Sequence, residues 1–139
     1  MAKYFTLKEM TYSDTAKRLG ITNTPPPSIK AHLEELMTFL DGLREAWGSA
    51  IKVTSGYRCA ALNKAIKGST TSAHLYGYGV DLVPINGKME EFKKFCAEWI
   101  EDKSWDQLLL EKSKTTEWIH LGLKNRYGMQ RKQIKLMNV

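Results

Sequence analysis

The chain has 139 residues, of which 42% are hydrophobic, and a formal net charge of +6. This length predicts a single domain over residues 1–139, and the apolar content with four tryptophans argues against disorder. No stretch approaches the roughly 20 apolar residues that span a bilayer, and the N-terminal MAKYFTLKEM lacks the apolar core of a secretory signal. We therefore expect a monomer that is synthesised in the cytoplasm and has no stable association with a membrane.

Positive charge concentrates near the C-terminus, where LKNRYGMQRKQIK (residues 123–135) contains no acidic residue. Such a segment favours anionic partners, either nucleic acid or a cell wall that carries phosphate or carboxylate groups. An ordinary solvated surface is the simpler alternative. Because no known nucleic-acid-binding motif accompanies the segment, we expect no nucleic acid partner.

The N-terminal third is predicted to be helical. Short helical pieces are expected over residues 4–20, with Thr6 and Ser13 as N-caps. The segment NTPPPS (23–28) breaks any helix and is predicted to be a loop. The clearest element follows, a helix from Ser28 to Gly48 in which apolar residues recur at helical spacing.

Short strands and helices alternate over the rest of the chain. Strands are predicted at 50–57, 79–83, 106–111 and 117–123, helices at 58–66 and 88–102, and a final edge strand at 133–138. Because these elements show no regular strand–helix–strand period, the pattern predicts an α+β fold. The expected architecture is a small antiparallel sheet flanked by helices that pack on one side.

Histidine is scarce, and two of the three histidines stand in unusual places. His32 flanks the apolar stripe of the long helix and is expected to be structural or exposed. In WIHLGL, strand alternation sends the apolar residues to one face and His120 to the other. Asp81 stands in the same way between the apolar residues of GVDLV. A carboxylate there needs a partner, since burying an unpaired charge costs several kcal/mol.

A metal ion would be such a partner. Gly77 and Gly79 would let the chain bend so that His74 and Asp81 reach one ion. Catalytic zinc takes three protein ligands and keeps a fourth position for water. Cys59 and Cys96, by contrast, have no metal-ligand neighbours in sequence and are expected to be free thiols. The pattern alone leaves open that each histidine has an ordinary polar partner.

Four stretches occur in order along the chain: FTLKEMTYSDTAKRLGITNTPP, IKVTSGYRCAALNKAIKGSTTSAHLYGYGVDL, WDQLLLE and EWIHLGL. Together they resemble the zinc D-Ala-D-Ala carboxypeptidase family, which has the hedgehog-like peptidase fold and includes phage wall-lysing peptidases. The SGYR, SxHxxGxxxD and WxH elements are jointly specific. The resemblance implies a zinc metallopeptidase that hydrolyses peptide bonds in peptidoglycan stem peptides.

The resemblance also implies roles for individual residues. One Zn²⁺ would be held by His74, Asp81 and His120. Glu117, three residues before the last histidine, would be the general base. Arg58 of SGYR would face the substrate near the metal, and Ser72 and Tyr76 are further substrate-binding candidates. Surface, capping or packing roles are the alternatives for these last four residues.

Two details qualify this assignment. Residues i and i+3 of an unbroken strand point to opposite faces, so we expect Glu117 to lie in the loop entering the strand or at a bulge. The polar run KSKTTE fits that expectation. Gly79 stands where the family usually has alanine, a change that we expect to be harmless.

The bond that is cut, the alternative to an enzyme and the route to the cell wall stay open at this point. The bond cut could be the terminal D-Ala-D-Ala bond, a D-Ala cross-link or the L-Ala-D-Glu bond. The alternative to an enzyme is a catalytically inactive zinc-binding domain of the same fold that serves as a cell-wall-binding or structural module. Without a signal peptide, the chain resembles a phage-type endolysin, which would reach the cell wall after a separate protein permeabilises the membrane.

Overall fold

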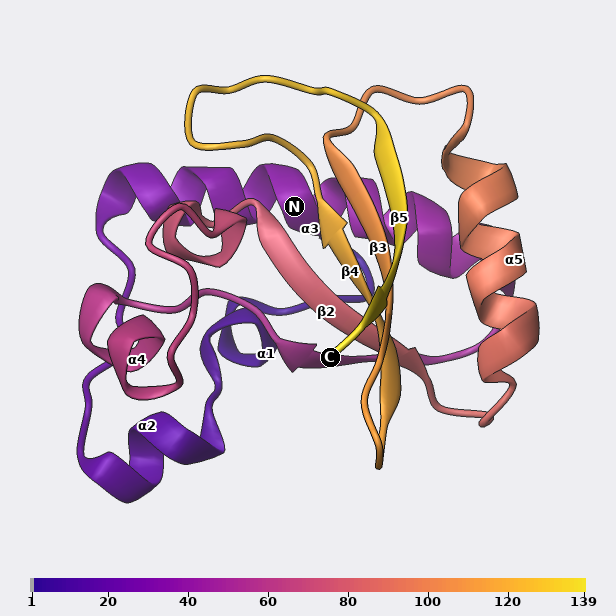
Figure 1. The fold of residues 1–139 in the computed structure, drawn as a ribbon. Helices are drawn as coiled ribbons and strands as arrows, with labels where there is room; N and C mark the ends of the chain where they lie inside the picture. The colour runs from indigo at the N-terminus through magenta and orange to yellow at the C-terminus, as the bar shows by residue number, and fades with distance from the viewer. Residues whose placement is uncertain (1) are drawn as a thin grey trace.

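The computed structural model describes residues 2–139 (Figure 1). In chain order the elements are α1 (Leu7–Thr11), α2 (Asp14–Leu19), α3 (Pro27–Trp47), β1 (Ile51–Ser55), α4 (Ala60–Ala65), the 3₁₀ helix η1 (Ala73–Tyr76), β2 (Gly79–Pro84), α5 (Met89–Ile100), β3 (Gln107–Lys112), β4 (Glu117–Gly122) and β5 (Gln133–Asn138).

The helix starts follow local capping rules. Thr6 caps α1 in a capping box with Glu9, and Ser13 accepts a hydrogen bond from the backbone of α2. The long helix α3 begins at Pro27 rather than after a Ser28 cap, because proline is tolerated at the first helical position, where its missing N–H is not needed. No helix within residues 2–139 combines the length and apolar character needed to cross a membrane.

The five strands form one sheet in the order β1-β2-β4-β3-β5. The first four are antiparallel to their neighbours, which confirms the predicted α+β class. The edge strand β5 instead runs parallel to β3, so the sheet is mixed. The reason is local: residues 123–132 form a loop that leaves β4 beside Gln107 and returns to Gln107, where β5 starts (Figure 1).

The helical layer covers one face of this sheet. In Figure 1, α3 crosses behind the strands, and α5 packs against α3, β2 and β4. The strands direct alternate side chains toward the helices, and these are fully or nearly fully buried: Val80, Leu82, Leu108, Ile119 and Leu121. Both cysteines are free, and Cys96 lies in this core. The opposite face of the sheet is therefore free to carry polar side chains.

Candidate metal centre

Two neighbouring strands place a carboxylate beside an imidazole. Asp81 of β2 and His120 of β4 are direct partners in the antiparallel register. Their sequence neighbours point into the core, so strand alternation turns both polar side chains to the opposite face. Directly opposed side chains of an antiparallel pair lie close together. The strand pairing itself thus forms half of the site.

The third polar side chain comes from η1, which packs against β2. Ser72 caps this helix by accepting a hydrogen bond from the His74 backbone N–H at 3.2 Å. Gly77 ends it in the left-handed conformation at φ 76°, which turns the chain back into β2. A Cβ on Gly79 would stand 2.8 Å from the His74 backbone nitrogen. Only glycine therefore allows η1 to pack this closely, and the close packing sets the position of His74.

Three candidate ligand atoms converge. His120 Nδ1 lies 3.2 Å from His74 Nε2 and 3.0 Å from Asp81 Oδ1, and His74 Nε2 lies 3.3 Å from Asp81 Oδ1. Ligand atoms of a tetrahedral zinc site with bonds of about 2.0–2.1 Å are separated by about 3.3 Å. The triangle therefore has the size of one face of such a tetrahedron. The donor set of two imidazoles and one carboxylate also suits zinc.

The surroundings of His74 and Asp81 favour the protonation states in which these side chains can bind a metal. His74 Nδ1 lies 2.7 Å from the Gly56 carbonyl oxygen, so Nδ1–H donates to the backbone and the Nε2 lone pair faces the other two groups. Burial lowers the pKa of His74, which favours the neutral imidazole that a metal requires. Burial alone would raise the pKa of Asp81, but the two imidazoles outweigh it and hold that pKa well below its usual value.

The three groups lie in an open cavity of about 520 Å³. Several other polar side chains line it, contributed by the N-cap of η1, by β3 and by the loops after β1 and before β5: Arg58, Ser72, Gln107, Glu111 and Arg131. The cavity is therefore large enough to hold a peptide segment beside the three groups.

Glu111 is a site residue that the sequence analysis did not single out. It alternates with buried Leu108 and half-buried Leu110 in β3, which places it on the same face as His120. The Trp118 indole N–H donates to Glu111 Oε2 at 2.7 Å. Burial, together with the nearby charge of Asp81, raises the pKa of Glu111. The alternation in QLLLE, combined with an antiparallel hairpin to WIH, is the signal that could have found it.

Arg58 and Ser72 line the cavity of the cluster. Arg58 Nη2 donates to Ser72 Oγ at 3.3 Å, and the Arg58 backbone N–H donates to the His74 carbonyl oxygen at 3.1 Å. The Arg58 Nε–H is buried and has no hydrogen-bond partner within residues 2–139. Such an unsatisfied cationic donor is unusual in a folded protein and is consistent with a ligand that completes it.

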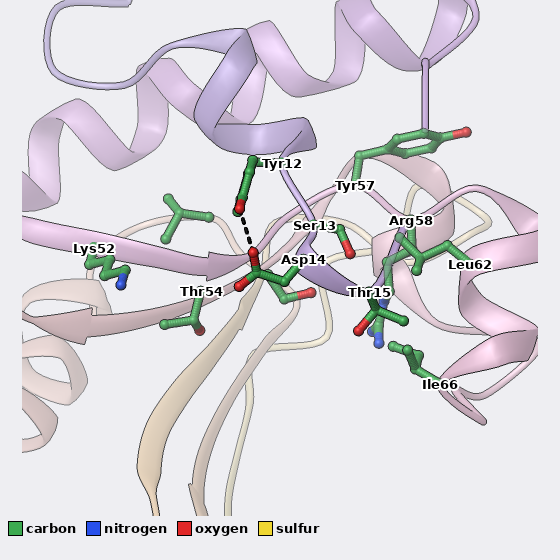
Figure 2. Close-up of a pocket in the computed structure, with 12 residues that line it drawn as sticks. Tyr12, Ser13, Asp14, Thr15, Lys52, Thr54, Tyr57, Arg58, Leu62 and Ile66 are labelled. Carbon is green, nitrogen blue, oxygen red and sulfur yellow. Dashed lines mark hydrogen bonds between the residues drawn. The ribbon is translucent and has the colours of Figure 1, made fainter. Parts of the chain in front are cut away.

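Arg58 also borders a second cavity, of about 420 Å³, on the β1 side of the molecule (Figure 2). Figure 2 shows Asp14 near its centre, hydrogen-bonded to Tyr12, with Lys52 and Thr54 of β1 along one side. Arg58 thus lines both cavities.

Glu117 does not lie where the sequence analysis expected. It is the first residue of β4 and pairs in regular register with Lys112, with neither a loop nor a bulge. The strand is unbroken, so Glu117 faces away from His120. Its carboxylate forms ion pairs with Lys93 of α5 and with Lys112, and it lines a different cavity. The expected position of Glu117 beside the metal ligands is therefore wrong.

The remaining candidate, Tyr76, and its neighbour Tyr78 both contact His32 of α3. Tyr76 is not among the residues that line the cluster's cavity, and its carbonyl oxygen lies 2.7 Å from His32 Nδ1. Tyr78 stacks on the His32 ring at 4.2 Å and donates its hydroxyl to Glu35. His32 is thus a packing residue, as predicted, and the structure does not place Tyr76 in the cleft.

Fold and site together define an α+β protein with a candidate catalytic metal centre. Comparison with known families gives a match to Peptidase M15 over residues 3–122, most of the chain. The protein therefore belongs to the peptidase M15 family, the group of zinc D-Ala-D-Ala carboxypeptidase-like enzymes that the sequence motifs resemble. Comparison with curated proteins gives no match.

Proposed function

We propose that this protein is a zinc-dependent peptidase that hydrolyses a peptide bond in peptidoglycan stem peptides. The observation that carries the proposal is the triangle of His74, Asp81 and His120, which has the dimensions of a zinc site and shares a cavity with Glu111 and Arg58. Membership of the peptidase M15 family supports the reaction class. Stem peptides carry free carboxylates, which suit a cleft lined by two arginines.

His74, Asp81 and His120 would hold the zinc ion, and when bound it would supply Lewis acidity for the scissile carbonyl and for a water molecule near neutral pH. Glu111, rather than Glu117, is the general base in this proposal. Its Oε2 is held by the Trp118 indole, which leaves Oε1 to accept a proton from the attacking water and deliver it to the leaving amine. The pKa of Glu111 is raised toward neutral pH, which suits a group that takes up and returns a proton.

Arg58 has a separate role. Its buried Nε–H has no partner within residues 2–139, and its Nη2 is held by Ser72. A fixed, desolvated cation at this place stabilises negative charge that develops on the substrate carbonyl oxygen or holds a substrate carboxylate. Ser72 thereby acts on the substrate through Arg58 and through its cap on η1, where it positions His74.

The test is digestion of purified muropeptides followed by mass spectrometry, with and without a chelator. We expect new fragments that vanish on chelation and return when zinc is added. Their masses identify the bond: loss of one alanine, separation of a cross-linked dimer, or cleavage next to the first alanine. If no metal condition yields new fragments, the enzyme proposal fails and the inactive zinc-binding domain takes its place.

A further inference from the structure

The basic segment that follows β4 lies outside the family match, which ends at residue 122. The basic residues of this segment have different contacts in the structure. Lys124 forms an ion pair with Glu35 of α3 at 2.8 Å, and the Arg126 guanidinium lies 4.6 Å from the ring centre of Tyr127. Arg131 is the one basic residue of this segment that lines the cavity of the candidate metal centre.

Arg131 is held in place by a buried carboxylate. Its Nε donates to Asp106 Oδ1 at 2.8 Å and its Nη2 donates to Oδ2 at 2.9 Å, while the Arg131 backbone N–H also donates to Oδ1. The Asp106 side chain is 2% exposed and the Arg131 side chain is 38% exposed. A guanidinium has five N–H donors, so three remain after the pair with Asp106, including both on Nη1.

The sheet order places Arg131 and Arg58 on opposite sides of the cluster. The candidate ligands come from η1, β2 and β4, whereas Arg58 follows the edge strand β1 and Arg131 precedes the other edge strand, β5. The start of β5 is joined to this face by a hydrogen bond from the Gln107 side chain to that of Gln133. Gln107 itself lines the cavity. Arg131, in the segment after β4, therefore lines the cavity on the side away from Arg58.

We propose that Arg131, oriented by Asp106, binds a free carboxylate of the peptide substrate on the side of the metal centre away from Arg58. This inference rests on the proposed peptidase function and adds a specificity residue to it. Guanidinium and carboxylate pair bidentately, with a geometry that a neutral amide does not reproduce. The enzyme accordingly prefers a substrate that carries a carboxylate at that position over the matching carboxamide.

The experiment uses synthetic stem peptides in which each carboxylate is replaced, one at a time, by a carboxamide. For the wild-type enzyme we expect one replacement to lower kcat/KM about ten- to a hundredfold, the size of one charged hydrogen-bonded contact, mainly through KM. In the double variant Asp106→Asn/Arg131→Gln this preference for acid over amide should fall to near one. The double change avoids leaving Asp106 as an unpaired buried charge.

Two further variants make the result specific. Lys132→Gln removes the neighbouring charge, which does not line the cavity, and should keep the wild-type preference. Arg131→Lys keeps the positive charge but loses the planar fork and should reduce the preference without abolishing it. Circular dichroism and zinc content show that each variant is folded and loaded.

Two results would overturn the inference while leaving hydrolysis established. One is a wild-type enzyme indifferent to every acid-to-amide replacement, which requires no variant to observe. The other is a double variant or an Arg131→Lys variant that keeps the full wild-type preference. Absence of hydrolysis of all the peptides by the zinc-loaded wild type would instead contradict the proposed function itself.

Discussion

At the scale of single residues, the chemistry depends on which face of its strand each acidic side chain takes. Glu111 and Glu117 are close in sequence and lie on paired strands, yet only Glu111 shares the face of His120. Glu117 instead joins β4 to α5 through Lys93. Because side chains alternate between the two faces of a sheet, Glu111 is a candidate general base on one face, whereas Glu117 forms a structural ion pair on the other.

Exchanging each glutamate for glutamine tests this assignment. We expect Glu111→Gln to lower kcat on muropeptides by about 10²- to 10⁴-fold, because glutamine cannot accept the proton. Zinc content should stay at the wild-type level, since Glu111 is not one of the three candidate ligands. The matched variant Glu117→Gln should retain activity close to wild type. The opposite ranking of the two variants would return the role to Glu117.

A second residue-scale prediction concerns Asp106 and pH. The pKa of Asp106 is lowered, because its bonds to the Arg131 guanidinium and backbone outweigh the effect of burial. A carboxyl whose pKa is lower in the folded state stabilises the fold above its ordinary pKa, and this contribution is lost as the pH falls through the folded value. Asp106→Asn should therefore cost about 2 kcal/mol at pH 7.

Urea unfolding of wild type and Asp106→Asn at pH 7 and at pH 3 checks this prediction. The difference in free energy of unfolding should shrink at the lower pH, because the wild-type carboxyl is then becoming protonated. A difference that stays equal at both pH values would show that the charge of Asp106 does not carry its contribution.

At the scale of elements, the short helix η1 is the least regular part of the site. It is held by the Ser72 cap, by the hydrogen bond from His74 to Gly56 and by close packing at Gly79. A methyl group at position 79 would meet the His74 backbone nitrogen at 2.8 Å, so η1 would have to shift. The expectation that glycine in place of alanine is harmless thus gains a reason specific to this chain: here the glycine is needed.

We predict that Gly79→Ala weakens zinc affinity about 10- to 100-fold, the usual cost of disturbing a metal ligand's support. Competition with a fluorescent zinc chelator measures this directly. Gly87→Ala is not a neutral comparison, because Gly87 has a positive φ of 76°. Gly42→Ala in α3 is better, since Gly42 lies in the helical layer and its Cβ would meet only the Trp99 ring, at 3.2 Å. Equal zinc affinity in both variants would contradict the proposed role of Gly79.

At the scale of the whole molecule, the core and the candidate metal centre occupy opposite faces of one sheet. The apolar side chains of α3 and α5 fill the helical face, while the three candidate ligands join β2, β4 and η1 on the other. The hydrophobic core does not include the three candidate ligands, so we expect the fold not to depend on the metal. We expect zinc to bind the three candidate ligands only in their folded arrangement and therefore to stabilise the folded state by mass action.

Zinc at 100 times its dissociation constant should accordingly stabilise the protein by about 2.7 kcal/mol, which raises Tm on the order of 10 °C. Chelation should lower Tm without unfolding the protein at 25 °C. Differential scanning calorimetry with and without zinc measures the shift, and His74→Ala should remove most of it. Loss of the folded state on chelation alone would mean that the metal is part of the fold.

The sequence alone predicted the α-helices and the strands, because these depend on local rules, but it did not predict the 3₁₀ helix η1. Capping at Thr6 and Ser13, helical spacing along α3 and period-two alternation around Asp81 and His120 are all readable within a few residues. The SxHxxGxxxD and WxH motifs add the ligand set through resemblance. None of these signals requires knowledge of which strands are neighbours.

Only the tertiary structure decided which further side chains join the ligands. The pairing of β3 with β4 brings Glu111 to the cluster, and the unbroken start of β4 takes Glu117 away from it. The loop after β4 returns to the start of β3, which makes β5 parallel and brings Arg131 to Asp106. The physical reason is that a side chain's face follows from local alternation, whereas its neighbours follow from strand order and register, which pairing across the whole chain sets.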